Sequence, residues 1–158
     1  MKASETKFQP IIEGTKQYVV PLFQRPYSWE KKEWDVLWED LIWLCENEEP
    51  TSHFIGSIVT MPTVSVPEGV SKFLLIDGQQ RLTTIFILLT LLRDAAKSKG
   101  DNDLAQEIEQ TMLVNPFKKG GDYFKLLPTQ IDRNAFKVLI QSAETNIDGR
   151  ILQCYQFF

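Results

Sequence analysis

The chain has 158 residues, of which 43% are hydrophobic and 24% charged, and its net charge at pH 7 is −4. These values are those of an ordinary globular protein of one domain, or of the first part of a longer one. The acidic balance argues against a surface that is basic throughout and coats nucleic acid, although a local basic groove stays open. Two cysteines and one histidine cannot supply the four ligands of a structural zinc site.

The chain ends and the longest apolar stretch bear on the location of the protein and on whether the chain is a fragment. The N-terminal sequence lacks the apolar core of a secretory signal, and the longest apolar stretch, residues 82–92, is too short to cross a membrane. We therefore expect a cytoplasmic protein without a membrane partner. The last residues, 150–158 (RILQCYQFF), predict the start of an apolar helix. Because domains seldom end on two exposed phenylalanines, we expect the chain to be a fragment of a longer protein.

The first part of the chain predicts a strand, a loop and an amphipathic helix. Residues 17–22 favour a strand, and the FQRPYSW segment, residues 23–29, favours a loop because its proline disfavours helix at the preceding residue. Ser28 is predicted to cap a helix that ends near Glu46, with apolar side chains spaced along one buried face. Those core positions are Trp34, Leu37, Trp38, Leu41, Ile42 and Cys45.

Two buried strands and a long helix follow. The sequence FIGSIVTM at residues 54–61 predicts a strand, and residues 62–69 a loop. A second apolar run at residues 73–76 predicts another strand, which ends abruptly at an Asp-Gly pair. The helix predicted after it spans residues 79–99 and ends at Gly100.

The remaining residues are predicted to be mostly helical. A loop with a small basic patch, NPFKKGGD, covers residues 115–122. The predicted elements around this loop are a helix at 103–113, a strand at 123–127, and helices at 129–143 and 150–158. The fold class expected is therefore α/β of the mixed α+β kind, with a small mixed sheet packed against several helices and a helix-rich C-terminal part.

The segment LIDGQQRLTT, residues 75–84, is the strongest functional signal in the chain. A buried strand that turns directly into a helix makes an anion site, because free backbone N–H groups and the positive end of the helix dipole face the turn. Arg81 is placed to bind a phosphate, and Asp77 to hold a metal ion or a water molecule. The structural alternative is a plain turn in which Asp77 caps the helix and pairs with Arg81.

The FQRPYSW loop is a candidate second wall of the same site. Gln24 and Arg25 would donate hydrogen bonds to phosphate, and Tyr27 or Trp29 would stack on a base. A packed loop with two core aromatics explains the same residues equally well. The sequence leaves both interpretations open.

The other reactive residue types favour structural roles. His53 is expected to cap a strand or face solvent, because no Ser or Cys nucleophile pairs with it from sequence. Cys45 and Cys154 are expected in the core, and Lys118 and Lys119 in a solvated loop. The chain contains neither a P-loop nor a dinucleotide-binding glycine motif.

Three motifs together carry a resemblance to a known family. FQRPYSW, FIGSIV at residues 54–59 and LIDGQQRLTT, in this order and spacing, resemble the N-terminal domain of GmrSD-type modification-dependent restriction endonucleases, described as ParB/sulfiredoxin-like. Residues 125–140 and the aromatic residues 155–158 also fit the family pattern. The resemblance implies a ParB-like nucleotide-binding core at residues 1–100 and a helical extension at residues 101–158 that begins a longer protein.

The resemblance also implies a function. Such a domain binds and hydrolyses a nucleoside triphosphate with Mg²⁺, and a downstream HNH-type nuclease module, absent here, cuts modified phage DNA. In related ParB and sulfiredoxin proteins a Gly-x-x-Arg turn binds nucleotide phosphates, and Gly78 and Arg81 have that spacing. The implied catalytic residues are Asp77, Gln79 and Gln80, with Asp77 also the Mg²⁺ ligand. The implied nucleotide-binding residues are Gln24, Arg25, Tyr27, Gly78, Arg81 and Thr84.

Other functions stay open at this point. The chain is alternatively a DNA-binding module that senses modified DNA without turnover, which salt-dependent DNA binding would reveal. A third alternative is a domain that mainly docks other subunits, with the DGQQR turn purely structural. Self-association into a homo-oligomer is likewise undecided by the sequence.

Overall fold

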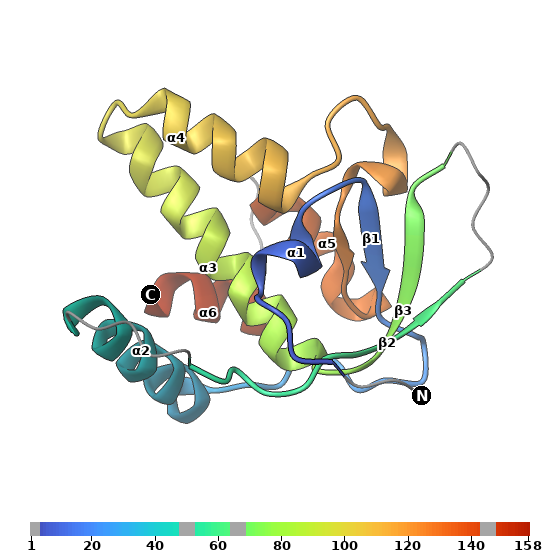
Figure 1. Ribbon diagram of the computed structural model, residues 1–158, viewed down its shortest axis with the longest axis horizontal. Coiled ribbons are helices and arrows are strands. Elements are labelled where there is room, and N and C mark those ends of the chain that lie inside the picture. The colour runs from blue at the N-terminus through green and yellow to red at the C-terminus, as the bar shows by residue number, and fades with distance from the viewer. Residues whose placement is uncertain (1–3, 48–52, 64–68, 143–147) are drawn as a thin grey trace.

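The computed structural model describes residues 4–47, 53–63, 69–142 and 148–158, and in this part of the chain a four-stranded sheet is packed against helices. The predicted class, a mixed α/β fold with a small mixed sheet, is confirmed. Figure 1 shows α3 running through the middle of the molecule, with the sheet on one side and α4 alongside the helix. The strands are β1 (Lys16–Val19), β2 (Val59–Pro62), β3 (Ser71–Asp77) and β4 (Leu126–Leu127).

Most of the remaining described residues are helical. The α-helices are α1 (Gln9–Ile12), α2 (Lys31–Glu46), α3 (Gln79–Ser98), α4 (Asn102–Glu107), α5 (Gln130–Ile140) and α6 (Arg150–Phe157). A π-helix, η1 (Ile108–Leu113), continues α4, and a 3₁₀-helix, η2 (Gly120–Tyr123), precedes β4. The predicted helix at 150–158 therefore corresponds to α6.

The sheet topology brings three connections to one edge. The strand order is β2-β3-β1-β4, with β1 parallel to both of its neighbours and β2 antiparallel to β3. The carboxyl ends of β1, β3 and β4 therefore lie side by side. The loop before α2, the turn into α3 and the segment before α5 all start there, which is where open α/β sheets bind ligands.

Helix α3 is the centre of the hydrophobic core. It packs against α4, η1, α5 and α6, so most of its faces are covered, which explains why its sequence is apolar nearly all round. Leu82, Phe86 and Ile87 have no exposed surface, and the Phe86 ring lies 6.4 Å from that of Phe136 on α5. Burial of these side chains is the main source of the stability of the fold.

The residues of the predicted C-terminal extension complete this core. Strand β4 pairs with β1, and Ile151 and Cys154 of α6 belong to the same core cluster as Leu75 of β3. The expectation that Cys154 is buried is thus confirmed. A domain division at residue 100 stays a prediction.

Two local predictions before β3 are wrong. Residues 54–58 do not form a strand, because Gly56 has a φ of +98° that takes the chain out of strand geometry, and β2 begins only at Val59. Ser28 does not cap α2. Glu30 is the N-cap residue and forms a capping box in which Glu33 Oε2 accepts from the Glu30 N–H at 2.9 Å.

Helix α2 is less buried than its amphipathic pattern predicts. Trp34 is buried, but Trp38 is 40% exposed, Ile42 is 37% exposed and Cys45 is exposed, so the prediction of core positions is wrong for these three. The reason is that, among the elements the structure describes, α2 makes its main helix contact with α6. The Trp34 ring lies 5.4 Å from Phe157 and the Trp38 ring 5.8 Å from Phe158, which leaves both phenylalanines half-buried.

The region from 102 to 127 differs in detail from the prediction. The helix predicted at 103–113 is α4 and η1 together, and the strand predicted at 123–127 is reduced to β4, with Phe124 forming an isolated bridge to Val114. In the basic loop, Lys119 is exposed and Lys118 is half-buried. Parts of the predicted loop 62–69 and of the predicted helix 129–143 lie outside the described residues.

Two further findings concern the described ranges only. None of their helices is long and apolar enough to span a bilayer. They also contain no cluster of three or more His, Cys, Asp or Glu side chains that would enclose a metal ion.

Candidate functional site

The three sequence motifs meet at the N-terminus of α3. The loop 23–29 follows β1, the segment 53–58 precedes β2, and both lie against the turn from β3 into α3. Gly78 is the N-cap residue of α3 with a φ of +88°, and a Cβ at this position would lie 2.9 Å from Ser57 O. Only glycine adopts this backbone easily and lets the segment 53–58 close over the turn.

The Gln80 side chain holds the loop 23–29 in place by two hydrogen bonds. Its Oε1 accepts from the Ser28 N–H at 2.8 Å, and its Nε2 donates to Pro26 O at 3.1 Å. The side chain is 8% exposed, so both hydrogen bonds are largely shielded from water. Gln80 therefore recognises loop backbone on both sides of Tyr27.

Gln79 and Gln24 extend this network. Gln79 Nε2 donates to Gln24 Oε1 at 3.1 Å and to Arg25 O at 3.2 Å. Gln24 Nε2 in turn donates to Ile76 O at 2.8 Å, at the end of β3. The two motifs that the sequence predicted to share a site are thus joined directly, and the Arg25 side chain projects from this fixed backbone into solvent.

Tyr27 and Thr84 lie inside the core. The Tyr27 hydroxyl is 2.6 Å from Thr84 Oγ1, donates to Cys154 Sγ and accepts from Trp34 Nε1 at 2.9 Å. Burial is the main reason why the pKa of the Tyr27 hydroxyl is raised. The same burial raises the pKa of Cys154 to about 12, so this thiol stays protonated and unreactive. Tyr27 and Thr84, both predicted to bind nucleotide, therefore connect elements of the fold through buried hydrogen bonds.

Arg81 lies between the core and solvent. Its guanidinium packs against the backbone of Gly56, where a Cβ would come within 2.5 Å of Arg81 Cζ, and its Nη1 donates to Ser57 O at 2.7 Å. Among the described residues this carbonyl is its hydrogen-bond partner. Arg81 is thus held in position while most of its donors stay available.

The turn leaves backbone N–H donors without an acceptor in the part of the chain that the structure describes. Within the described residues no acceptor binds the backbone N–H groups of Gln79, Gln80 and Arg81, and Gly78 has no side chain to cap them. Asp77 is exposed at the end of β3. No ion pair joins Asp77 to Arg81, two residues that the structure describes, so the arrangement expected of a plain structural turn is not present.

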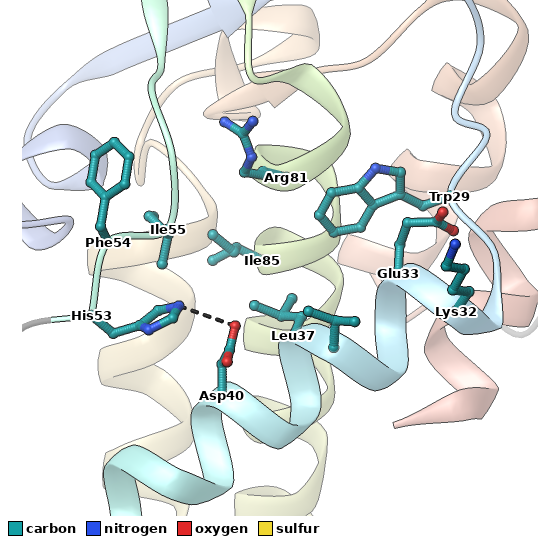
Figure 2. Close-up of a pocket in the computed structure, with 11 residues that line it drawn as sticks. Trp29, Lys32, Glu33, Leu37, Asp40, His53, Phe54, Ile55, Arg81 and Ile85 are labelled. Carbon is teal, nitrogen blue, oxygen red and sulfur yellow. Dashed lines mark ion pairs between the residues drawn. The ribbon is translucent and has the colours of Figure 1, made fainter.

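A cavity of about 260 Å³ opens beside Arg81, between α2, residues 53–55 and α3 (Figure 2). Arg81 lies at one end and the Asp40–His53 ion pair, with an N–O distance of 3.1 Å, at the other. The Trp29 ring forms a side wall, and apolar side chains lie between the two polar ends. His53 is half-buried here, whereas the sequence placed it in solvent or at a cap. The apolar side chains that the view labels are Leu37, Phe54, Ile55 and Ile85.

Comparison with known families agrees with the motifs. The profile of the GmrSD restriction endonuclease N-terminal domain matches residues 8–157, nearly the whole chain. The chain belongs to the GmrSD N-terminal domain family. No curated protein sequence matches it.

Sequence reasoning missed several residues of this GmrSD N-terminal domain site. Asp132 accepts from the Tyr27 N–H at 2.7 Å, and it forms a Thr-x-x-Asp pair with Thr129, whose Oγ1 donates to it at 2.5 Å. That spacing is a recognisable helix-start signal. Gly56 was detectable too, since a glycine inside an apparent strand marks a bulge or a close approach. Asp40 offered no signal, because it is one of several carboxylates on α2.

Proposed function

We propose that this GmrSD N-terminal domain binds a nucleoside triphosphate at the start of α3, hydrolyses it, and thereby regulates DNA cleavage by a nuclease module of the full-length restriction endonuclease. One observation supports this most strongly. Free backbone N–H groups, the Arg81 guanidinium and the Asp77 carboxylate occupy one turn, at the carboxyl edge of three parallel strands. This is a suitable combination for a phosphate chain with a cation.

The phosphates would bind first to the helix. The backbone N–H groups of Gln79, Gln80 and Arg81 point out of the N-terminus of α3, where the helix dipole also favours negative charge. The Arg81 guanidinium adds charged hydrogen bonds, and its contact with Ser57 O already sets its direction. Arg25, exposed on the opposite loop, is close enough in the fold to cover the phosphates from the other side.

Asp77 is the residue that fits Mg²⁺. It provides a single exposed carboxylate, and Mg²⁺ commonly takes one or two carboxylates together with phosphate oxygens and water. When bound, the ion would neutralise charge on the phosphates. Asp77 alternatively orients the attacking water and accepts its proton, and both assignments place it next to the reacting phosphate.

The buried polar residues of the motifs would act indirectly. Gln79 and Gln80 were candidates for catalysis, but their side-chain amides are occupied by loop backbone, so we assign them to positioning Arg25 and closing the site. Tyr27 and Thr84 connect the same loop to α3 and, through Cys154, to α6. A charge change on hydrolysis would thereby reach several elements at once.

Hydrolysis tests the assignment of Asp77. The chain is incubated with Mg²⁺ and each of the four ribonucleoside triphosphates, and phosphate release is measured for wild type, Asp77→Asn and the exposed control Asp103→Asn. We expect Asp77→Asn to lose about 100-fold or more in rate while nucleotide binding changes little. Unchanged hydrolysis in Asp77→Asn would refute its role, and a wild-type chain that binds no nucleotide would refute the proposal.

A second function is favoured by one separate feature. Phe117 is 97% exposed at a φ of +69°, a strained position for this residue, and Lys118 and Lys119 follow it. A displayed aromatic ring beside lysines is suited to contact with DNA. DNA binding that weakens with salt, is unaffected by nucleotides and is lost in Phe117→Ala would identify a DNA-sensing module without turnover.

A further inference from the structure

The cavity beside Arg81 is not needed for phosphate binding. It extends from the guanidinium toward Asp40 on α2, and Figure 2 shows the Trp29 ring, from the loop before α2, and Ile85 of α3 facing its interior. The walls are largely apolar and one of them is an aromatic plane. Such walls bind flat aromatic groups.

The Asp40 carboxylate, a hydrogen-bond acceptor, lies at the end of the cavity away from Arg81. Asp40 Oδ2 is 3.1 Å from His53 Nε2, which leaves Oδ1 without a partner among the described residues. Glu33 also lines the cavity, and one of its oxygens accepts the Glu30 N–H, a hydrogen bond that lowers the Glu33 pKa and keeps it ionised. The cations around the cavity are Lys32, Arg81 and, when protonated, His53.

We propose that this cavity is the nucleobase subsite of the nucleotide site, that Trp29 stacks on the base, and that Asp40 selects guanine. The proposal rests on the proposed function, since it requires the phosphates at Arg81. Arg81 borders both places, so a nucleotide with its phosphates at the α3 turn directs its base toward the cavity.

Guanine is the base that matches a carboxylate. An ionised Asp only accepts hydrogen bonds, and its two oxygens offer about four lone-pair sites, so Asp40 can accept from two adjacent donors while His53 keeps its contact with Oδ2. Guanine presents two adjacent donors, N1–H and N2–H₂, on one edge. Adenine and cytosine place a ring acceptor next to their amino group, and uracil has carbonyls on both sides of its single N–H. Each of these would set an acceptor against the carboxylate.

The test measures the affinity of the chain for GTP, ATP, CTP, UTP, XTP and inorganic tripolyphosphate by calorimetry with Mg²⁺. In wild type we expect GTP to bind about tenfold or more tightly than the other bases. Asp40→Asn presents a donor to the base and should reverse the preference between GTP and XTP, whose second ring carbonyl replaces the guanine amino group. Glu39→Gln, which removes an exposed carboxylate on the same helix, should change nothing.

Trp29 provides the second arm. Trp29→Ala should weaken GTP by about tenfold or more while leaving tripolyphosphate unchanged, and Trp29→Phe should restore most of the affinity. Equal affinity for all nucleotides and tripolyphosphate would overturn the base subsite but leave the phosphate site standing. A GTP preference that survives in Asp40→Asn would overturn the role of Asp40. If no probe binds, both the proposed function and this subsite are wrong.

Discussion

The two arginines of α3 serve different purposes. Arg93 has no exposed surface, and its guanidinium donates to the backbone of α5 at Ile140 O and to Ser142 Oγ at 2.6 Å. Arg81, three turns earlier, is half-buried and makes one hydrogen bond within the described part of the chain, to Ser57 O. One arginine is fully occupied by the protein and the other is held in place with donors to spare.

The difference shows how to tell an architectural arginine from a candidate ligand group. Arg93 satisfies carbonyls at the C-terminal end of α5 and pairs with Asp94 at 2.9 Å, so it closes a helix end that would otherwise lack partners. Arg81 lies at a helix start, where the unsatisfied groups are donors and no arginine is needed for capping. Its placement beside those donors makes sense if an anion binds there.

The largest effect is expected at Arg93. Arg93→Met leaves buried carbonyls of α5 and the Asp94 carboxylate without their donor, so it should lower the free energy of unfolding by about 3–5 kcal/mol. Urea unfolding followed by circular dichroism measures this. Lys97→Met, an exposed cation one turn away, is the control and should cost less than about 1 kcal/mol. A similar small cost in both variants would remove the contrast between the two arginines.

A moderate effect is expected at Gln80. Gln80→Leu removes the partners of the Ser28 N–H and of Pro26 O, and it should cost about 1–3 kcal/mol. Hydrogen exchange should show faster exchange of the Ser28 amide, while Gln80→Glu keeps the acceptor for that amide and should protect it. If Ser28 exchange is the same in Gln80→Leu as in wild type, the loop is held by something else.

Much of the fold was predictable because the apolar spacing follows the elements. The alternation of helix and strand around β3 and α3 comes from long apolar runs with clear ends, and the sheet class follows from their order. The irregular backbone of residues 54–58 was not predictable. The FIGSIV sequence contains enough β-branched residues for a strand, and what keeps it from being one is the Arg81 guanidinium packed against Gly56. Tertiary contacts override local propensity in such segments.

The site was predictable only in part. The sequence brought the DGQQR turn and the FQRPYSW loop together, and the hydrogen bonds of Gln79 and Gln80 join them. It did not reveal that these amides bind backbone and that Tyr27 is buried, because side-chain direction depends on packing. The cavity near Asp40 could not be predicted, because it depends on the space between α2 and α3, and the spacing of apolar residues does not determine that space.

A smaller, pH-dependent effect concerns Lys125, which is a buried cation like Arg93. Its Nζ donates to Ile12 O and Thr111 O, and burial, with a contribution from the charge of Lys16, lowers its pKa to about 8. Between pH 8 and the ordinary value of 10.5 the unfolded chain holds a proton that the folded chain has released, so stability rises with pH in this window.

Comparison with Lys125→Met isolates this effect, because all other titrating groups are common to both proteins. The stability of wild type relative to Lys125→Met should increase from pH 8 to 10 and be flat from pH 6 to 7.5, measured by urea unfolding at each pH. A difference that does not vary with pH would show that Lys125 keeps its proton when folded, as Arg93 does.

The smallest stability effect is expected at Arg81. Arg81→Gln loses one hydrogen bond at a half-exposed site, so the free energy of unfolding should fall by about 1 kcal/mol or less. The same urea unfolding experiment measures it beside Arg93→Met. A cost as large as that of Arg93→Met would make Arg81 an architectural residue as well.

Nucleotide affinity in Arg81→Gln tests the central claim most directly. Calorimetric titration of the Mg²⁺ complexes of the four ribonucleoside triphosphates into wild type, Arg81→Gln and the control Lys97→Gln should show saturable binding to wild type and to Lys97→Gln. In Arg81→Gln we expect the affinity to fall by about tenfold or more, through loss of a charged hydrogen bond, in a protein that remains folded. Equal affinity in all three proteins would contradict a phosphate site at the start of α3.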